Sequence, residues 1–205
     1  MRRGVNQLTI GMRRDDVTTL SYVTDTRGRV RHVTLIDPDK QSPQIASDRA
    51  CVAVEAGTSM IFVGGSTDTP DEIVHATCVA IQEGLELRAF AASQSPDGDE
   101  LRWQVPVVLF PGGSHALSPA ADAITFMMLM NSTDRRFLVG EQLRGAPYLD
   151  KFGVDALPTG YLVCHPGGKV GEVGSADLLM PDDVDLVKAY SCLLYTSPSP
   201  RDCLL

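Results

Sequence analysis

The sequence predicts an α/β fold in which helices cover a parallel sheet, and three observations support this prediction. The chain has 205 residues, of which 43% are hydrophobic, enough for a substantial core. Five continuous apolar runs occur along it, and each ends in a short segment of glycine, proline or polar residues. Helical patterns follow the runs. Continuous apolar strands, each followed by a helix, are typical of a parallel sheet that is buried on both faces.

The first two pairs of strand and helix have the clearest signals. An apolar run at residues 32–36 ends in the sequence DPD, and a helix is predicted over 43–56. A second run at 59–63 ends in GGST. The next helix opens at residues 69–72, where proline and two acids lie in the first turn, as a helix N-terminus favours.

Three further strands are predicted at residues 105–110, 123–130 and 159–164. A polar loop at 91–104 precedes them, and the later helices extend to about residue 151 and over about 181–191. In a parallel sheet, the loops after the carboxyl ends of the strands carry the chemistry. We therefore expect the site among the segments DPDK, GGST, PGG, NS and PGGKVG.

The chain divides into three parts by charge and pattern. Residues 1–31 form a basic N-terminal arm, a short strand or extended segment laid against the main body, because the first 32 residues carry a local charge of +4 in a chain of net charge −8. Residues 32–191 form the α/β domain. Residues 192–205 lack periodicity and are rich in serine and proline, so we interpret them as a non-native tail.

Composition excludes several classes of protein. A net charge of −8 disfavours general nucleic-acid binding. The longest apolar run, residues 124–130, is far below the ~20 residues that span a bilayer, and no secretory signal is found, so we expect a cytoplasmic protein. The five cysteines form no C-x-x-C pair and are expected to be reduced, with Cys51 and Cys78 buried as packing residues.

Two common nucleotide-binding motifs are also excluded. The Gly168-Lys169 pair lacks both the following Ser or Thr and the earlier glycine of a Walker loop. Glycines 168, 171 and 174 are spaced by threes, which does not match the G-x-G-x-x-G of a dinucleotide fold. Glycine-rich loops alone therefore identify no ligand.

Five ordered motifs resemble the geranylgeranylglyceryl phosphate synthase family, which includes bacterial heptaprenylglyceryl phosphate synthases. They are TLIDPDK (34–40), AGTSMIFVGGST (56–67), PVVLFPGG (106–113), ADAITFMMLMNS (121–132) and PTGYLVCHPGGKVGEVG (158–174). The resemblance implies a (β/α)₈ TIM-type barrel. It also implies a Mg²⁺-dependent prenyltransferase of ether-lipid biosynthesis that joins a long-chain prenyl diphosphate, geranylgeranyl diphosphate foremost, to sn-glycerol 1-phosphate.

The resemblance also implies a set of site residues. Asp37 and Ser66 match the family's metal-binding positions. Mg²⁺ suits such oxygen ligands, because it is usually bound through one or two protein oxygens together with substrate phosphates. Substrate-binding roles are expected for Lys40, Gly64, Gly65 and Thr67, although Lys40 is equally well explained as a solvated loop charge.

Only about the first five βα units of such a barrel are found in this chain. The family's catalytic glutamate follows a sixth strand, and its glycerophosphate loops follow the seventh and eighth; none of these motifs is present. We therefore expect a fragment of a longer synthase with its catalytic residue missing. As written, the chain is expected to be inactive and poorly soluble, since open strand edges and an apolar interior face water.

Several alternatives remain open. Met127, Met128 and Met130 line a prenyl groove or, more simply, fill the core. Glu172 is a candidate general base, and His165 faces the site or solvent. Two other interpretations of the whole chain are another phosphate-binding barrel enzyme and a non-catalytic barrel. Only the motifs TLIDPDK and FPGG argue against the first of these. We expect a homo-oligomer at full length, and contact of the lipid product with a membrane surface.

Overall fold

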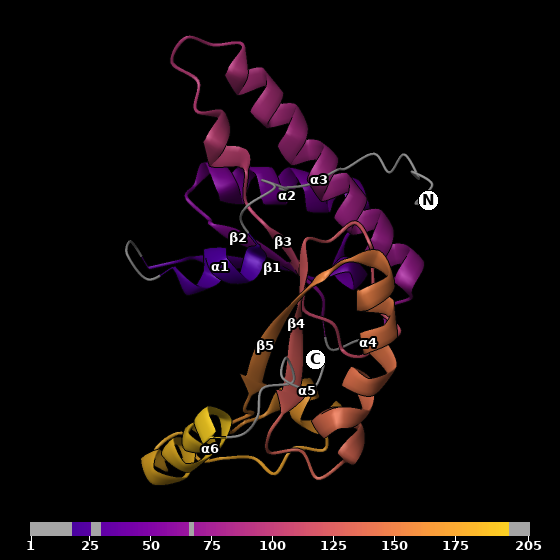
Figure 1. Cartoon of the computed structure of the whole chain (residues 1–205), viewed down its shortest axis with the longest axis vertical. Helices are drawn as coiled ribbons and strands as arrows, with labels where there is room; N and C mark the ends of the chain where they lie inside the picture. The colour runs from indigo at the N-terminus through magenta and orange to yellow at the C-terminus, as the bar shows by residue number, and fades with distance from the viewer. Residues whose placement is uncertain (1–17, 26–29, 66–67, 197–205) are drawn as a thin grey trace, which may run out of the picture.

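The computed structural model describes residues 18–25, 30–65 and 68–196. Within them, five strands form one parallel sheet in the order β1-β2-β3-β4-β5, which is also their order along the chain (Figure 1). The strands are β1 (Val33–Ile36), β2 (Met60–Val63), β3 (Val107–Leu109), β4 (Ala123–Leu129) and β5 (Asp155–Tyr161). The fold is α/β, with five parallel strands of the predicted barrel type. Neighbouring strands stay adjacent because every connection advances by one position.

Helices surround the sheet. They are α1 (Thr19–Thr24), α2 (Pro43–Glu55), α3 (Asp71–Ser93), α4 (Glu141–Phe152), α5 (Gly168–Val173) and α6 (Val184–Thr196). Short 3₁₀ turns occur at Pro38–Lys40 (η1) and Glu100–Trp103 (η2), and a π-helical turn at Arg136–Gly140 (η3) leads into α4. The predicted loop at 91–104 therefore contains the end of α3 and a 3₁₀ turn.

The helices α2 and α3 cover the outer face of β1 to β3 (Figure 1). Helix α2 begins where the side chain of Ser42 accepts a hydrogen bond from the Ile45 amide, and α3 begins with Asp71 and Glu72 in its first turn. The side chains between these helices and the sheet are fully or nearly fully buried: Ala46, Ala50, Val54, Val74, Cys78, Ile81 and Leu85. This layer is the main hydrophobic core.

The predicted basic arm contains a helix where a strand or extended segment was expected. In α1, the Thr19 amide donates to Asp155 Oδ2 at 2.9 Å, and the Tyr22 hydroxyl donates to the Ser59 carbonyl at 2.9 Å. Leu20 and Val23 pack against the inner cluster of Met60, Val108, Ala123 and Leu157. Helix α1 thus contacts the strands at their amino ends. Residues 1–17 and 26–29 of the arm lie outside the described residues.

Other features of the fold also differ from the prediction. No helix follows β3 in the described residues 110–122. Strand β5 begins at Asp155, four residues before the predicted start, because its pairing with β4 extends from Ala123↔Asp155 to Leu129↔Tyr161. Pro158 and Gly160 weaken the strand pattern in the sequence, because both residue types are unusual inside strands, and the start of β5 was therefore not predicted. Helix α6 extends through Thr196, across the predicted boundary at 191/192; the division into domains stays a prediction.

Two further predictions concern membranes and thiols. None of the helices within the described part of the chain combines the length and the apolarity needed to cross a bilayer. Cys51 and Cys78 are buried packing residues, as predicted, and neither forms a disulfide. Burial raises the pKa of the Cys78 thiol to about 12.

Candidate functional site

The carboxyl ends of β1 and β2 bring an acidic side chain and two glycines together. Asp37 follows β1 directly, and Gly64 and Gly65 follow β2. An added Cβ at Gly65 would lie 2.8 Å from Asp37 Oδ2, so the bare backbone of Gly65 is required for the carboxylate to lie here. Gly64 is required for a different reason, because a Cβ there would collide with the Phe110 carbonyl.

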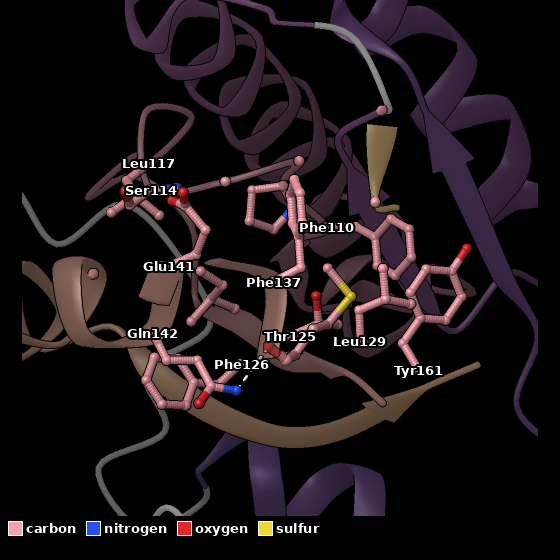
Figure 2. Close-up of a pocket in the computed structure, with 18 of the residues that line it drawn as sticks. Phe110, Ser114, Leu117, Thr125, Phe126, Leu129, Phe137, Glu141, Gln142 and Tyr161 are labelled. Carbon is pink, nitrogen blue, oxygen red and sulfur yellow. Dashed lines mark hydrogen bonds between the residues drawn. The ribbon is translucent and has the colours of Figure 1, made fainter. Parts of the chain in front are cut away.

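A cavity of about 330 Å³ begins beside Asp37 and Gly65. This volume lies within the range of about 300–1,000 Å³ that is usual for small-molecule sites. Its lining is mainly apolar and includes Leu35 and Met127. Figure 2 labels five further apolar lining residues, Phe110, Leu117, Leu129, Phe137 and Tyr161. An elongated apolar molecule with a metal-binding end suits such a cavity better than a small polar one.

The cavity contacts both faces of β4. Four consecutive residues of this strand line it, from Ile124 to Met127. Since successive side chains of a strand point to opposite faces, the cavity must pass from the inner face of the sheet to the space between β4 and α4. In that space it is lined by Phe126, Gln142 and Leu149 (Figure 2 labels the first two).

The passage exists because β3 and β4 separate early. They share only two paired positions, Val108↔Ala123 and Leu109↔Ile124, whereas β4 and β5 share seven. At the next position, the Thr125 hydroxyl donates to the Leu109 carbonyl at 3.0 Å. With no helix in residues 110–122, this side of the outer layer stays open.

Polar groups lie at the α4 end of the cavity. The Gln142 side chain donates to the Met127 carbonyl at 2.7 Å, which joins α4 to β4. Glu141 accepts hydrogen bonds from the Ser114 amide at 2.6 Å and from Arg136 Nε at 2.5 Å. Burial raises the pKa of Glu141, but the hydrogen bonds from Ser114 and Arg136 outweigh it, and the pKa lies at about 2.

The structure separates the predicted site residues into three groups. Asp37 and Gly65 line the cavity, and Gly64 adjoins them. Lys40 is exposed, lies 3.4 Å from Asp39 Oδ2 and does not line the cavity, so the interpretation as a solvated loop charge suits it better. Ser66 and Thr67 lie outside the described residues. The binding roles of all these residues stay predictions.

The three methionines take different positions. Met127 lines the cavity, as one of the two interpretations expected. Met130 is buried, and Met128 is half-buried and is not among the lining residues. Leu129 also lines the cavity, so the lining continues past Met127 on that face of β4, whereas on the opposite face it stops at Phe126, before Met128.

Several loop residues that were expected near the chemistry are structural. The Asn131 side chain donates to the carbonyls of Val163 and Asp177 and accepts from the Val163 amide. Ser132 donates to the Gly174 carbonyl. His165 and Glu172 are exposed and do not line the cavity. Glu172 is therefore poorly placed as a general base for a ligand in this cavity.

Sequence reasoning overlooked Glu141 and the opening beside β4. An acid at the start of a helical pattern was available as a signal, but it equally indicates ordinary stabilisation of a helix N-terminus. The missing helix after β3 was visible as a proline- and glycine-rich segment of 13 residues between two strands.

Comparison with known proteins identifies relatives of this chain. Residues 98–196 match the PcrB family. The chain is 39% identical over 171 residues to the geranylgeranylglyceryl phosphate synthase of Methanothermobacter marburgensis, covering 83% of this chain and 62% of the relative. It is 40% identical over 160 residues to the synthase of Thermoplasma volcanium, covering 78% and 56%. These similarities confirm the resemblance seen in the five motifs.

Solved structures of the same family resemble this chain as well. The wild-type synthase from Thermoplasma volcanium superposes with a TM-score of 0.76 at 36% identity, covering 88% of this chain and 66% of that one. The synthase from Thermoplasma acidophilum, solved in complex with sn-glycerol-1-phosphate, gives a TM-score of 0.73 at 35% identity, covering 87% and 66%. The chain spans about three fifths of the length of the curated relatives that it matches.

Proposed function

We propose that this chain carries the prenyl diphosphate side of a prenyltransferase that acts on sn-glycerol 1-phosphate. The observation that carries the proposal is an apolar cavity that starts at a strand-end carboxylate. The similarity to geranylgeranylglyceryl phosphate synthases supports the same reaction, and one of these relatives was solved with sn-glycerol-1-phosphate. The product is a prenylglyceryl phosphate ether, a precursor of membrane lipids, together with diphosphate.

The polarity of the cavity suggests how the prenyl diphosphate lies. Its diphosphate is placed at Asp37 and Gly65, and its hydrocarbon chain extends past Phe110 and Thr125 into the space beside Phe126. Binding in the cavity moves the prenyl chain from water into an apolar environment, which is favourable. It also keeps water from the allylic carbon, so that a glycerol hydroxyl reacts there in place of water.

The residues present fit a single hard cation. Asp37 Oδ1 accepts from the Asp39 amide at 3.0 Å, which orients the carboxylate toward the cavity that it lines. Within the described residues, no cluster of three or more His, Cys, Asp or Glu side chains is present. Mg²⁺ suits this environment, because it commonly takes its other ligands from substrate phosphates and water. When bound, Mg²⁺ would neutralise the charge of the leaving diphosphate.

Two further roles belong to the proposal, one for Ser66 and one for residues outside the five described strands. Ser66 is proposed as a second metal ligand, on the family resemblance alone. The general base and the groups that grip the glycerophosphate are proposed to follow strands beyond those described. Cytoplasmic location, homo-oligomeric assembly and contact of the lipid product with a membrane surface stay predictions.

Binding and transfer can be tested separately. Isothermal titration of the chain with geranylgeranyl diphosphate should give a complex that is tighter with Mg²⁺ than with EDTA. Transfer to sn-glycerol 1-phosphate is then assayed on the chain extended by the C-terminal part of the Thermoplasma volcanium relative. Binding with subsequent transfer supports the proposal. Failure to bind the prenyl diphosphate, or tighter binding of a small polar phosphate such as ribose 5-phosphate, would favour another barrel enzyme or a non-catalytic barrel.

A further inference from the structure

Residues 110–122, which we call the β3–β4 connection, form one wall of the cavity without a helix of their own. Their second half is fastened to α3. The fully buried Ser118 hydroxyl lies 2.9 Å from His75 Nδ1, and Gln82 donates to the Ala120 carbonyl at 3.3 Å. Their first half lines the cavity and contacts α4 instead.

Glu141 makes that contact with α4. Its Oε2 accepts from the Ser114 amide at 2.6 Å, and a Cβ added to Gly113 would lie 3.1 Å from the same oxygen. Its Oε1 accepts from Arg136 Nε at 2.5 Å and from Arg144 at 3.1 Å. One carboxylate oxygen therefore holds the β3–β4 connection, while the other is held by the η3 turn and by α4.

The electrostatics suit a fixed contact better than proton transfer. The Glu141 side chain is 14% exposed, and both of its oxygens are engaged. With a pKa of about 2, it remains ionised over the whole neutral range. A general base near neutral pH needs a pKa closer to the working pH.

We propose that Glu141 is a positioning residue that fixes the spacing between the β3–β4 connection and α4, and thereby the fit of the prenyl chain in the cavity between them. The inference rests on the proposed function for the identity of the ligand. The contact itself does not depend on that identity. Glu141 acts through Ser114 and is not placed at the reacting atoms.

The test compares wild type with Glu141→Ala, Glu141→Gln and Arg144→Ala. Amide hydrogen exchange at Ser114, followed by NMR, should quicken about tenfold in Glu141→Ala, because a hydrogen bond to a charged group is lost. Glu141→Gln keeps an acceptor oxygen and should give an intermediate rate. Arg144→Ala is the matched control, since Arg144 contacts Oε1 and not the connection.

Titration with geranylgeranyl and farnesyl diphosphates gives a readout that a purely structural role would not move. A preorganised wall lowers the ordering cost of binding, so Glu141→Ala should lose about tenfold in affinity for the longer chain. The ratio of the two affinities should fall with it, while Arg144→Ala keeps both values.

Each outcome has a separate meaning. Unchanged exchange at Ser114 in Glu141→Ala overturns the inference, as does faster exchange with an unchanged affinity ratio. If Glu141→Ala fails to fold, Glu141→Gln decides by the same two measurements. If the wild type binds neither diphosphate, the proposed function fails and the ligand assigned here fails with it.

Discussion

The two halves of the sheet differ in how their outer faces are covered. Over β1 to β3, the helices α2 and α3 bury small side chains closely, and an added Cβ at Gly84 would collide with the Ser47 hydroxyl. Over β4, the helix α4 covers the side on which β3 separates from β4 (Figure 1). A cavity remains there (Figure 2). The first half has fully buried packing, whereas the second half has a ligand-sized space.

The difference shows how a repetitive fold acquires a specific site. Each strand followed by a helix closes its own section of the outer layer. After β3, the β3–β4 connection takes the place of a helix, and this section of the outer layer stays open. The walls of the cavity there depend on contacts such as the hydrogen bond from the Ser114 amide to Glu141. Substitutions in the packed core of the first half should therefore change stability, whereas substitutions of residues that line the cavity should change binding.

The largest effect is expected in the closed half. Ile81 on α3 is fully buried, and Ile81→Ala should lower the free energy of unfolding by about 4 kcal/mol through lost burial and a residual cavity. Leu87→Ala on the same helix is the control, because Leu87 is 68% exposed and should change stability by less than about 0.5 kcal/mol. Urea denaturation measures both. Equal effects would show that α3 is not packed as described.

The second effect concerns Asp37 at the strand ends. Asp37→Asn should weaken Mg²⁺-dependent binding of geranylgeranyl diphosphate by about 30-fold, since a neutral amide is a poorer ligand for a hard cation. Thermal stability should stay the same, because the side chain is not part of the packed core. Asp39→Asn is the matched control on an exposed neighbour. Isothermal titration with Mg²⁺ and with EDTA checks this, and an unchanged Mg²⁺ dependence removes Asp37 as a ligand.

The third effect is a pH dependence of stability at Glu141. Its pKa of about 2 in the folded protein lies below the ordinary value near 4.5, so the ionised form stabilises the fold above about pH 5, and this contribution is lost as the pH falls toward 2. Glu141→Gln has no such titration. Urea unfolding from pH 2 to 7 should show the two proteins diverging by about 2 kcal/mol as pH rises. Parallel profiles would contradict the hydrogen-bonded carboxylate.

The smallest effect compares neighbours on β4. Met127→Trp should reduce the affinity for geranylgeranyl diphosphate about fivefold relative to farnesyl diphosphate, because the larger side chain occupies the cavity. Met128→Trp, at a half-buried position that does not line the cavity, should lower stability through overpacking and leave the ratio of affinities unchanged. Reversal of these two outcomes would place the prenyl chain beside Met128 instead of Met127.

The sequence by itself determined β1 to β4, the approximate positions of α2, α3, α4 and α6, and the strand-end position of Asp37. Continuous apolar runs identified β1, β2 and β4 to within a residue or two, and the helical pattern over residues 43–56 located α2. These features depend on local propensity and on hydrophobic pattern, which adjacent residues specify. The motif TLIDPDK also carried the family resemblance that the comparisons confirm.

Only the tertiary structure decided what depends on pairing between distant segments. The start of β5 follows from its register with β4, not from its own sequence, since Pro158 and Gly160 weaken the strand pattern. The cavity exists because β3 and β4 separate after two paired positions, and Glu141 meets Ser114 across 27 residues. Local pattern specifies which face of a segment is apolar, but the space left between two segments is set by which neighbours they pair with and how far that pairing continues.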